Sequence, residues 1–332
     1  MTGRATLPAG GPIRLERIAL REIRLPLVEP FRISSGVVDT RRILLLTLRD
    51  ADGAEAWSEC VAEARPNYSA ETVDTRRLAL AEWVAPRVLG AEFAHPGDVH
   101  AALARDVRGH HMAKAAVEMG CWALAAVRAG VPLARLLGGT RDRVDVGVSL
   151  GIQPSPAALV ERAAAALAER YRKVKLKVEP GRDVAYVAAV RETLVAEAPL
   201  MADANNAYTL DDPAHLAALE ALDGLGLMMV EQPLAHDDLV RHAALQRRLR
   251  TPLCLDESVT GVERAEDMLT LGAGRVVWAR DVVTPEWTMD AAGQTRVPLD
   301  RPGLGVDVDA NRIDDLTVWR AVLGPRGPAP PH

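Results

Sequence analysis

The stretch YRKVKLKVEP, residues 171–180, alternates basic and apolar side chains, with Lys173, Lys175 and Lys177 at every second position. A period of two predicts a β-strand with one cationic face and one apolar face. Nearby runs such as GLGLMMVEQP are almost wholly apolar, as expected of strands that are buried on both faces of a parallel sheet. Among such apolar strands, a cationic strand face is either exposed to water or contributes to a site in the protein interior.

Strand-like and helix-like runs alternate from residue 144 onward. The first helix-like run opens with Ser155 and Pro156, residue types that favour the N-cap and the first position of a helix. Five β-then-α units follow at roughly 30-residue spacing, and such alternation predicts a parallel sheet. Because so many similar units are present, we expect a (β/α) barrel rather than an open sheet. The five strand-like runs read VDVGVSLGI, KVKLKV, PLMADAN, GLMMVEQP and TPLCLDES.

The segments before and after this repeat have a different pattern of apolar and polar residues. Residues 14–62 alternate apolar and polar side chains and carry an Asp52-Gly53 turn, which predicts antiparallel strands. Residues 70–137 have a helical period, so this half is expected to form an α+β domain. After the fifth unit, GRVVW would begin a sixth strand, and the chain then becomes turn-rich before a predicted closing helix at NRIDDLTVWRAVL.

Three of the strand-like runs end on a carboxylate, at Asp203, Glu231 and Asp256. One βα unit separates each from the next, so consecutive strands would present one acid apiece at the C-terminal rim, where barrel enzymes keep their active sites. Converging carboxylates repel one another unless a cation is present, and oxygen ligands of this kind suit Mg²⁺. The alternative is that each acid only caps the following helix.

Lys175 and Lys177 would share the interior with these carboxylates. A lysine near a metal ion and a second lysine has a lowered pKa, which lets it act as a base near neutral pH. Its natural reaction is removal of a proton α to a carboxylate, while the metal stabilises the enediolate. Lys173, at the far end of the strand, is expected to be solvated. The alternative is an amphipathic strand with one wet face.

The composition argues against several classes of protein. The 332-residue chain has a net charge of −5 and scattered basic residues, so we expect no nucleic-acid binding. Charges interrupt every apolar run too early for a membrane span. Residues 1–13 lack the apolar region of a signal peptide and are expected to be flexible. The Pro/Gly-rich residues 324–332 are expected to be disordered. Three distant cysteines, Cys60, Cys121 and Cys254, fit reduced thiols in the cytoplasm.

The sequence resembles the enolase superfamily, in its muconate-lactonizing-type branch with a lysine-x-lysine strand. Within that branch it is similar to the o-succinylbenzoate synthases and the N-acylamino acid racemases. The resemblance covers about 14–277 and 281–320, and the joint occurrence of its motifs is far more specific than any one of them. Besides the runs quoted above, it is carried by PFRISSG, GHHMAKAAVEMGCWAL, DANNAYTL and VPLDRPGLGVDVD.

The resemblance implies an α+β capping domain at 14–143, an enolase-type (β/α) barrel at 144–280 and a C-terminal segment, 281–323, that returns to the cap. It implies that Lys177 is the acid/base catalyst, with Lys175 beside it. The other implied site residues are ligands of Mg²⁺ or Mn²⁺ (Asp203, Glu231 and Asp256), two residues behind them (Asn205 and Glu257) and a substrate loop (Phe31, Ser34, Ser35 and Tyr68).

One motif of the family is missing. The resemblance implies a second lysine on the sixth strand, shortly after RVV, but Arg280 stands about there, and an arginine stays protonated. The sequence after about residue 277 therefore indicates an internal deletion that removes most of barrel units 6–8. A shortened barrel would leave strand edges unpaired.

The resemblance further implies a small-molecule carboxylate substrate and a cytoplasmic homo-oligomer. In the synthase reaction, 2-succinyl-6-hydroxycyclohexadiene-1-carboxylate loses water to give o-succinylbenzoate, a step in menaquinone biosynthesis, and one lysine can serve both proton transfers. Racemisation of an N-acylamino acid needs a base on each face of the substrate, so we predict the synthase first and the racemase second. The alternative of another class is a catalytically inactive remnant that only binds or oligomerises.

Overall fold

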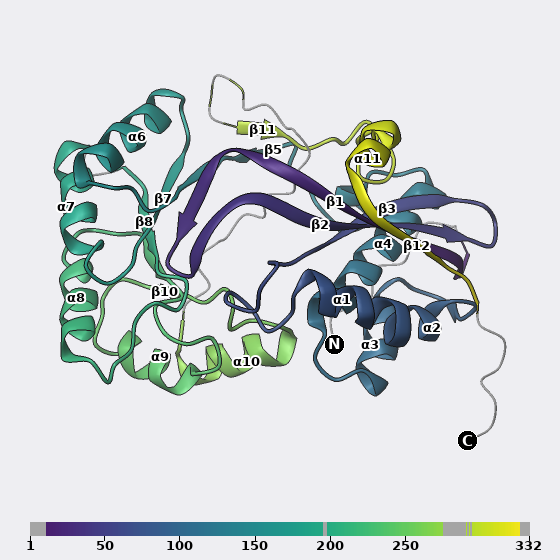
Figure 1. Cartoon of the computed structure of the whole chain (residues 1–332), viewed down its shortest axis with the longest axis horizontal. Coiled ribbons are helices and arrows are strands. Elements are labelled where there is room, and N and C mark those ends of the chain that lie inside the picture. The colour runs from purple at the N-terminus through teal and green to yellow at the C-terminus, as the bar shows by residue number, and fades with distance from the viewer. Residues whose placement is uncertain (1–10, 195–197, 275–289, 291, 293, 326–332) are drawn as a thin grey trace. The chain divides into compact units, whose positions relative to one another are not determined.

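The computed structural model describes residues 11–194, 198–274, 290, 292 and 294–325 (Figure 1). Contacts divide the chain into two compact units, each assembled from separate segments. Unit 1 comprises Met1–Leu27, Thr40–Asp142 and Val297–His332, and unit 2 comprises Val28–Asp39 and Arg143–Arg296. The domain boundaries expected from the sequence stay predictions, and this division differs from them in assigning 28–39 to the second unit and in extending that unit to Arg296.

Unit 1 contains an antiparallel sheet in the strand order β12-β1-β2-β3, with the short strand β4 paired to β1. Strand β2 has a regular register with β3, from Ile43 opposite Val61 to Arg49 opposite Glu55. The predicted turn at Asp52-Gly53 joins these two strands. The strands are β1 (Ile13–Ile33), β2 (Gly36–Asp50), β3 (Glu55–Val61), β4 (Glu92–Phe93) and β12 (Thr317–Leu323).

The helices of unit 1 pack a shared core against this sheet. Helix α4 is capped at its C-terminal end by Gly130, whose φ of 66° suits a residue without a Cβ. Helix α4 packs closely against the sheet at Gly120. A Cβ added there would lie 2.5 Å from Leu48 Cδ1 and 3.0 Å from Ser58 Oγ. The helical elements are α1 (Val73–Ala79), η1 (Leu80–Val84), α2 (Ala85–Val88), α3 (Gly97–Asp106), α4 (His111–Ala129) and α5 (Leu133–Leu136).

The closing helix predicted at 311–323 is wrong in its second half. Only α11 (Ala310–Leu316) is helical, and the next residues form β12, which pairs antiparallel with β1. Exposure alternates along β12, with Trp319 and Leu323 packed against the core of unit 1. A period of two and a run of β-branched and aromatic residues favour a strand here.

Unit 2 contains a parallel sheet in the order β10-β9-β8-β7-β6. The five predicted strand regions are confirmed, although the first divides into two strands and the last ends before Asp256. In the described part of the chain, β6 and β10 form the two edges of this sheet. The strands are β5 (Arg143–Asp145), β6 (Gly147–Leu150), β7 (Lys173–Lys177), β8 (Leu200–Asp203), β9 (Met229–Glu231) and β10 (Leu253–Cys254). Strand β5 pairs outside this sheet, with β11 (Gln294–Arg296).

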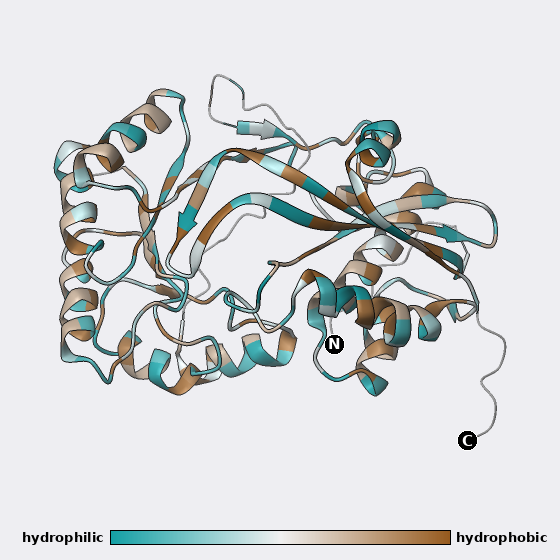
Figure 2. Cartoon of the chain, in the orientation of Figure 1, coloured by the Kyte–Doolittle hydropathy of each residue, from teal (hydrophilic) through white to brown (hydrophobic). Residues whose placement is uncertain are grey.

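Helices connect these strands and cover one face of the sheet (Figure 1). The first helix has the predicted cap, with Ser155 Oγ accepting a hydrogen bond from the backbone nitrogen of Ala158. In Figure 2 the helices carry both apolar and polar residues, as expected of helices with one buried face. They are α6 (Pro156–Ala168), α7 (Val184–Thr193), α8 (Pro213–Asp223), α9 (Leu239–Gln246) and α10 (Val262–Leu271).

Two further predictions can be compared only in part with the structure. The predicted sixth strand at 274–278 and Arg280 lie almost wholly outside the described residues. Among the described helices, none combines the length and the apolar content that crossing a lipid bilayer requires.

Candidate active site

Strand β7 divides its side chains between two environments. Val174 and Leu176 are fully buried in the hydrophobic core that the helices form on one face of the sheet. Because side chains alternate along a strand, the three lysines lie on the opposite face. The wet-face alternative does not hold for Lys177, which is only 9% exposed.

Both lysines that the sequence predicts to be catalytic form ion pairs with Asp203. The parallel register places Lys177 opposite Asp203 on β8, and Asp203 is fully buried. Lys177 Nζ lies 2.6 Å and Lys175 Nζ 2.9 Å from Asp203 Oδ2. A carboxylate buried so completely is stable only with such charged partners.

Glu231 lies next to Asp203, because β9 is in register with β8 and pairs these two residues. Lys175 Nζ donates to both of its carboxylate oxygens, at 3.0 and 3.2 Å. Lys175 therefore bridges the two carboxylates, and the four side chains together carry no net charge when all are ionised.

The carboxylates of this cluster act on the protonation of Lys175. Burial acts to lower the pKa of Lys175, but the charges of Asp203 and Glu231 outweigh burial and raise it. The expected lowering presumes a metal ion beside the two lysines, so it stays a prediction. Burial and the charge of Asp203 raise the pKa of Glu231 to about 7 against the opposing effect of Lys175, whereas the two lysines overcome burial to lower the pKa of Asp203.

The two residues predicted behind the ligands extend the cluster. Asn205 Oδ1 accepts from Lys177 Nζ at 2.7 Å, and its Nδ2 donates to Glu257 Oε1 at 3.0 Å. Burial raises the pKa of Glu257, against the effect of its hydrogen bond with Asn205. A chain of side-chain contacts thus runs from β7 to the segment after β10.

The predicted substrate loop divides between the two units. Ser34 Oγ donates to the carbonyl oxygens of Ala204 and Asn205, at 2.9 and 3.2 Å, so the loop of unit 2 lies beside the strand end that carries Asp203. Phe31, near the end of β1, and Ser35, in the turn after it, also belong to unit 2 and are half-buried. Tyr68 is a half-buried residue of unit 1, and its role in the site stays a prediction.

The third predicted ligand stands apart from the first two. Strand β10 ends at Cys254, so Asp256 lies two residues beyond the strand and is exposed. Among the described residues, no three His, Cys, Asp or Glu side chains are grouped closely enough to hold a metal ion. The adjacent oxygens of Asp203 and Glu231 suit a hard divalent cation, and the role of Asp256 as a third ligand stays a prediction.

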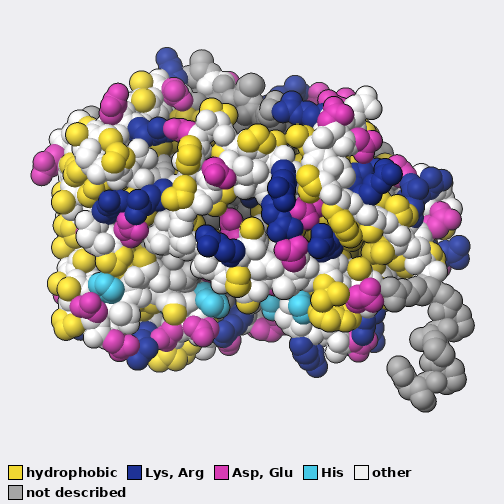
Figure 3. Space-filling view, viewed as in Figure 1, with side chains coloured by type: hydrophobic (Ala, Val, Ile, Leu, Met, Phe, Trp, Pro, Cys, Tyr) yellow, Lys and Arg dark blue, Asp and Glu magenta, His cyan; other side chains and the backbone are white. Residues whose placement is uncertain are grey.

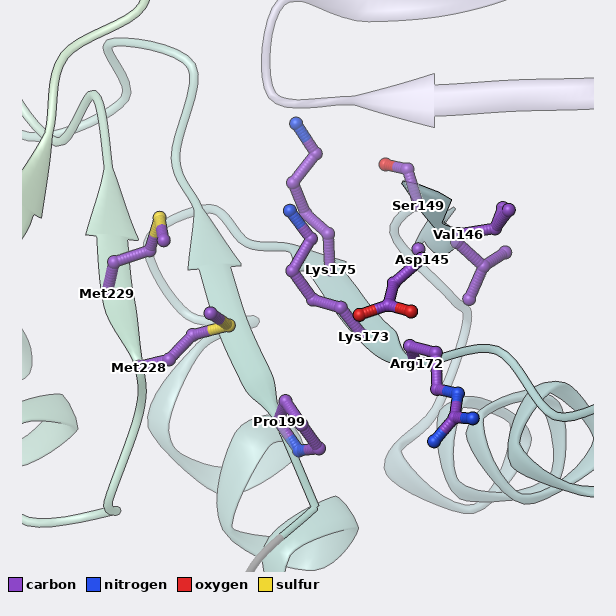
Figure 4. A pocket seen from close by; sticks show the side chains of 11 residues that line it. Asp145, Val146, Ser149, Arg172, Lys173, Lys175, Pro199, Met228 and Met229 are labelled. Carbon is purple, nitrogen blue, oxygen red and sulfur yellow. The ribbon is translucent and has the colours of Figure 1, made fainter. Parts of the chain in front are cut away.

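A cavity of about 440 Å³ opens on the lysine face of unit 2 (Figure 4). Lys173 and Lys175 point in the same direction in its wall, with Met229 across from them and Ser149 on the neighbouring strand. Lys173 is half-buried there. Lys173, which the sequence predicts to be solvated, thus borders the same cavity as Lys175.

Sequence reasoning missed Gln232, which follows Glu231 directly. Gln232 is fully buried and has a φ of 38°, in the left-handed region that few non-glycine residues adopt. Asn205 and Asn206, just after the Asp203 strand, have positive φ as well. The available signal was a polar residue at the end of an otherwise apolar run, in VEQP.

Two family profiles match most of the chain. Residues 17–138 match the profile described as mandelate racemase / muconate lactonizing enzyme, N-terminal domain, and residues 158–280 match the one described as enolase C-terminal domain-like. The chain therefore belongs to the enolase superfamily, a family of enzymes that joins an N-terminal capping domain to a C-terminal barrel-like domain.

Individual relatives show which kinds of enzyme within the family this chain resembles. The o-succinylbenzoate synthase of Geobacillus kaustophilus is 36% identical over 368 aligned positions, which cover 92% of this chain and 96% of the relative. The N-succinylamino acid racemase of Thermus thermophilus is 49% identical over 264 residues, 80% of this chain and 70% of the relative. A solved enolase superfamily member from Listeria innocua is 26% identical, with a TM-score of 0.86 over 94% of this chain and 99% of that one.

Proposed function

We propose that this chain is an o-succinylbenzoate synthase-like dehydratase acting on a small-molecule carboxylate. The observation that carries the proposal is the placement of Lys177 and Lys175 against Asp203 and Glu231, on three neighbouring strands in register. Relatives named o-succinylbenzoate synthase support it.

In the proposed reaction, Lys177 Nζ takes the α-proton of the substrate and returns it to the departing hydroxyl on the same face. A carbon–carbon double bond forms, the carbon–oxygen bond breaks, and the hydroxyl leaves as water. Lys177 acts as a base only as the neutral amine, so it must first give up one proton to solvent and release Asp203 Oδ2, to which it donates at 2.6 Å. Lys175, whose pKa is raised, stays charged beside the base.

We propose Mg²⁺ or Mn²⁺ as the cofactor, held by Asp203, Glu231 and Asp256. When bound, it would stabilise the negative charge that develops on the substrate carboxylate as the proton leaves. The chemistry of the donor set supports this choice, since all three side chains offer oxygen.

The second candidate function is racemisation of an N-acylamino acid. It is favoured by the 49% identity to the Thermus thermophilus N-succinylamino acid racemase. The racemase needs a second base, and the position predicted for it, near Arg280, lies outside the described residues. The synthase remains our first proposal because it requires Lys177 alone.

We also propose that this chain lacks part of the barrel found in its relatives. The alignment with the Geobacillus kaustophilus enzyme extends over 368 positions, more than the 332 residues of this chain. Loss of whole strands would favour the alternative of an inactive remnant, so activity must be measured directly.

The test is the synthase assay with Mg²⁺ on the wild-type chain and on two matched lysine variants. Lys177→Ala should abolish turnover, whereas Lys173→Ala, two positions before the pair on the same strand, should keep most of it. An equal loss in both variants would contradict the assigned role of Lys177. A folded wild-type chain without turnover would favour the remnant, and exchange of the α-hydrogen of an N-succinylamino acid with solvent would favour the racemase.

A further inference from the structure

The segment Val28–Asp39, which we call the tip segment, is a part of unit 2 in which every residue is half-buried or exposed. It contains the end of β1, the turn after it and the start of β2. Its ion pairs, Glu29 with Arg162 and Arg32 with Glu179, join partly exposed side chains, and such pairs stabilise a structure only weakly. The position of the segment therefore depends on its backbone and hydroxyl contacts.

The backbone of the tip segment lies directly against Gly151. Gly151 and Ile152 follow Leu150, the last residue of β6, and both are buried. The backbone nitrogen of Ile152 donates to Arg32 O at 2.9 Å. A Cβ added at Gly151 would lie 2.9 Å from Arg32 O, 3.2 Å from Arg32 N and 3.4 Å from Phe31 Cδ2. Since two of these are backbone atoms, a side chain at residue 151 would force the segment away.

The turn of the tip segment lies beside the proposed base. Ser34 Oγ donates to Ala204 O at 2.9 Å and to Asn205 O at 3.2 Å. These two residues follow Asp203, the last residue of β8. The Asn205 side chain in turn accepts from Lys177 Nζ at 2.7 Å. Asn205 therefore contacts both the tip segment and the nitrogen that is proposed to take the substrate proton.

We infer that Gly151 is a positioning residue that holds the tip segment beside Lys177 and so sets the affinity of unit 2 for the carboxylate substrate. The inference rests on the proposed function, in which the substrate lies against Lys177 Nζ. A substrate there would also lie next to Asn205 and the tip segment, which can contact it only in the docked position. The apparent affinity of a ligand falls with the fraction of molecules in the binding-competent state.

Gly151→Ala should raise KM by about tenfold, with a much smaller change in kcat. The added methyl group must displace a backbone oxygen, and overpacking of this kind typically shifts an equilibrium by about 10–100-fold. Saturating substrate restores the docked state, so turnover at saturation is largely kept. A variant that only damaged the fold would lower kcat or the amount of active protein and would leave KM as it was.

Gly224 provides a matched control in the same unit. It caps the C-terminal end of α8 with a φ of −78°, and the nearest atom to an added Cβ, Ala221 O, is 3.4 Å away. Gly224 precedes β9, whereas the tip segment contacts residues that follow β6 and β8. Gly224→Ala is the same substitution without a close approach, and it should leave KM unchanged.

The experiment measures KM and kcat of the synthase reaction on the full chain with Mg²⁺, together with hydrogen exchange of the Ile152 amide without substrate. That amide donates to Arg32 O, so its exchange reports whether the tip segment is docked. In Gly151→Ala the exchange should become faster and KM should rise, while Gly224→Ala should match the wild type in both. An unchanged KM in Gly151→Ala, or an equal rise in both variants, would overturn the positioning role.

A gentler variant covers the case in which Gly151→Ala does not fold. Ser34→Ala removes the two hydrogen bonds of Ser34 Oγ and should raise KM in the same direction, to a smaller extent. Unchanged KM and unchanged Ile152 exchange in Ser34→Ala would then overturn the inference. A folded wild-type chain that neither turns over nor binds o-succinylbenzoate overturns the proposed function itself. In that case faster Ile152 exchange in Gly151→Ala alone would still support the contact of Gly151 with the tip segment, which distinguishes the two failures.

Discussion

Lys175 and Lys177 stand two residues apart on one strand but have different partners. Lys175 bridges Asp203 and Glu231, whereas Lys177 contacts Asp203 and Asn205. Lys175 therefore balances the charge of Glu231, and Lys177 is the lysine with a neutral amide among its contacts. This difference supports the proposed roles, in which Lys175 assists and Lys177 carries out the proton transfers.

Lys175→Ala should destabilise the chain at pH 8, by about 3 kcal/mol, because it leaves buried carboxylate charge without its partner. The loss should be smaller at pH 5.5. Below the Glu231 pKa of about 7, that carboxyl is mostly protonated and needs no counter-charge. Urea unfolding at the two pH values measures both numbers. An equal loss at both would show that Glu231 does not carry the effect.

Metal affinity should rise with pH through the titration of Glu231. Its folded-state pKa of about 7 means that a proton competes with the metal below that pH, since a ligating carboxylate must be ionised. We expect Mg²⁺ affinity to fall as pH decreases from 8 to 6 and to level off above about 7.5. Titration calorimetry at several pH values tests this. Glu231→Gln should bind weakly and lose most of the pH dependence.

At the scale of the element, helix α4 depends on a close approach at Gly120. Gly120→Ala should raise the intrinsic helix propensity yet lower stability, by about 1–3 kcal/mol, because its Cβ would overlap Leu48. Gly224→Ala is the control, since the nearest atom to its added Cβ lies at 3.4 Å and its φ of −78° suits any residue. Thermal unfolding of the two variants should separate them. A stable Gly120→Ala would mean that the sheet yields at this point.

Much of the element pattern could be predicted because local physics determines it. Alternation located β7, and Ser155 with Pro156 located the start of α6. The helix predicted over 317–323 overlooked the period of two along β12, and pairing with β1 completes that strand. The sequence pattern could not predict Asp256 and Gln232, because the end of β10 and the hydrogen bonds beyond it depend on contacts between chain segments that no periodicity encodes.

At the scale of the whole molecule, the candidate ligands all belong to unit 2. Basic and acidic side chains are interspersed on the face shown in Figure 3, without a single-sign field around one region. We therefore expect a bound metal ion to act through specific contacts in unit 2 rather than through a general charge effect.

Saturating Mg²⁺ should therefore protect the two units unequally. A ligand at 100 times its Kd adds about 2.7 kcal/mol to the stability of the unit that binds it. Hydrogen exchange should slow by up to about a hundredfold in peptides from β8 and change little in peptides from β2. Mass spectrometry with and without a chelator measures this. Equal slowing in both would show that the two units unfold as one.

The pairing of β12 with β1 also has a consequence for the order of events during translation. Strand β1 is synthesised roughly 300 residues before its partner, Thr317–Leu323 (Figure 1). At about 5–20 residues per second, the nascent β1 waits on the order of 15–60 s with that edge open. During this interval the ribosome-bound chain exposes a strand ready to pair with any neighbour, which makes it a natural client for chaperones that shield nascent sheets.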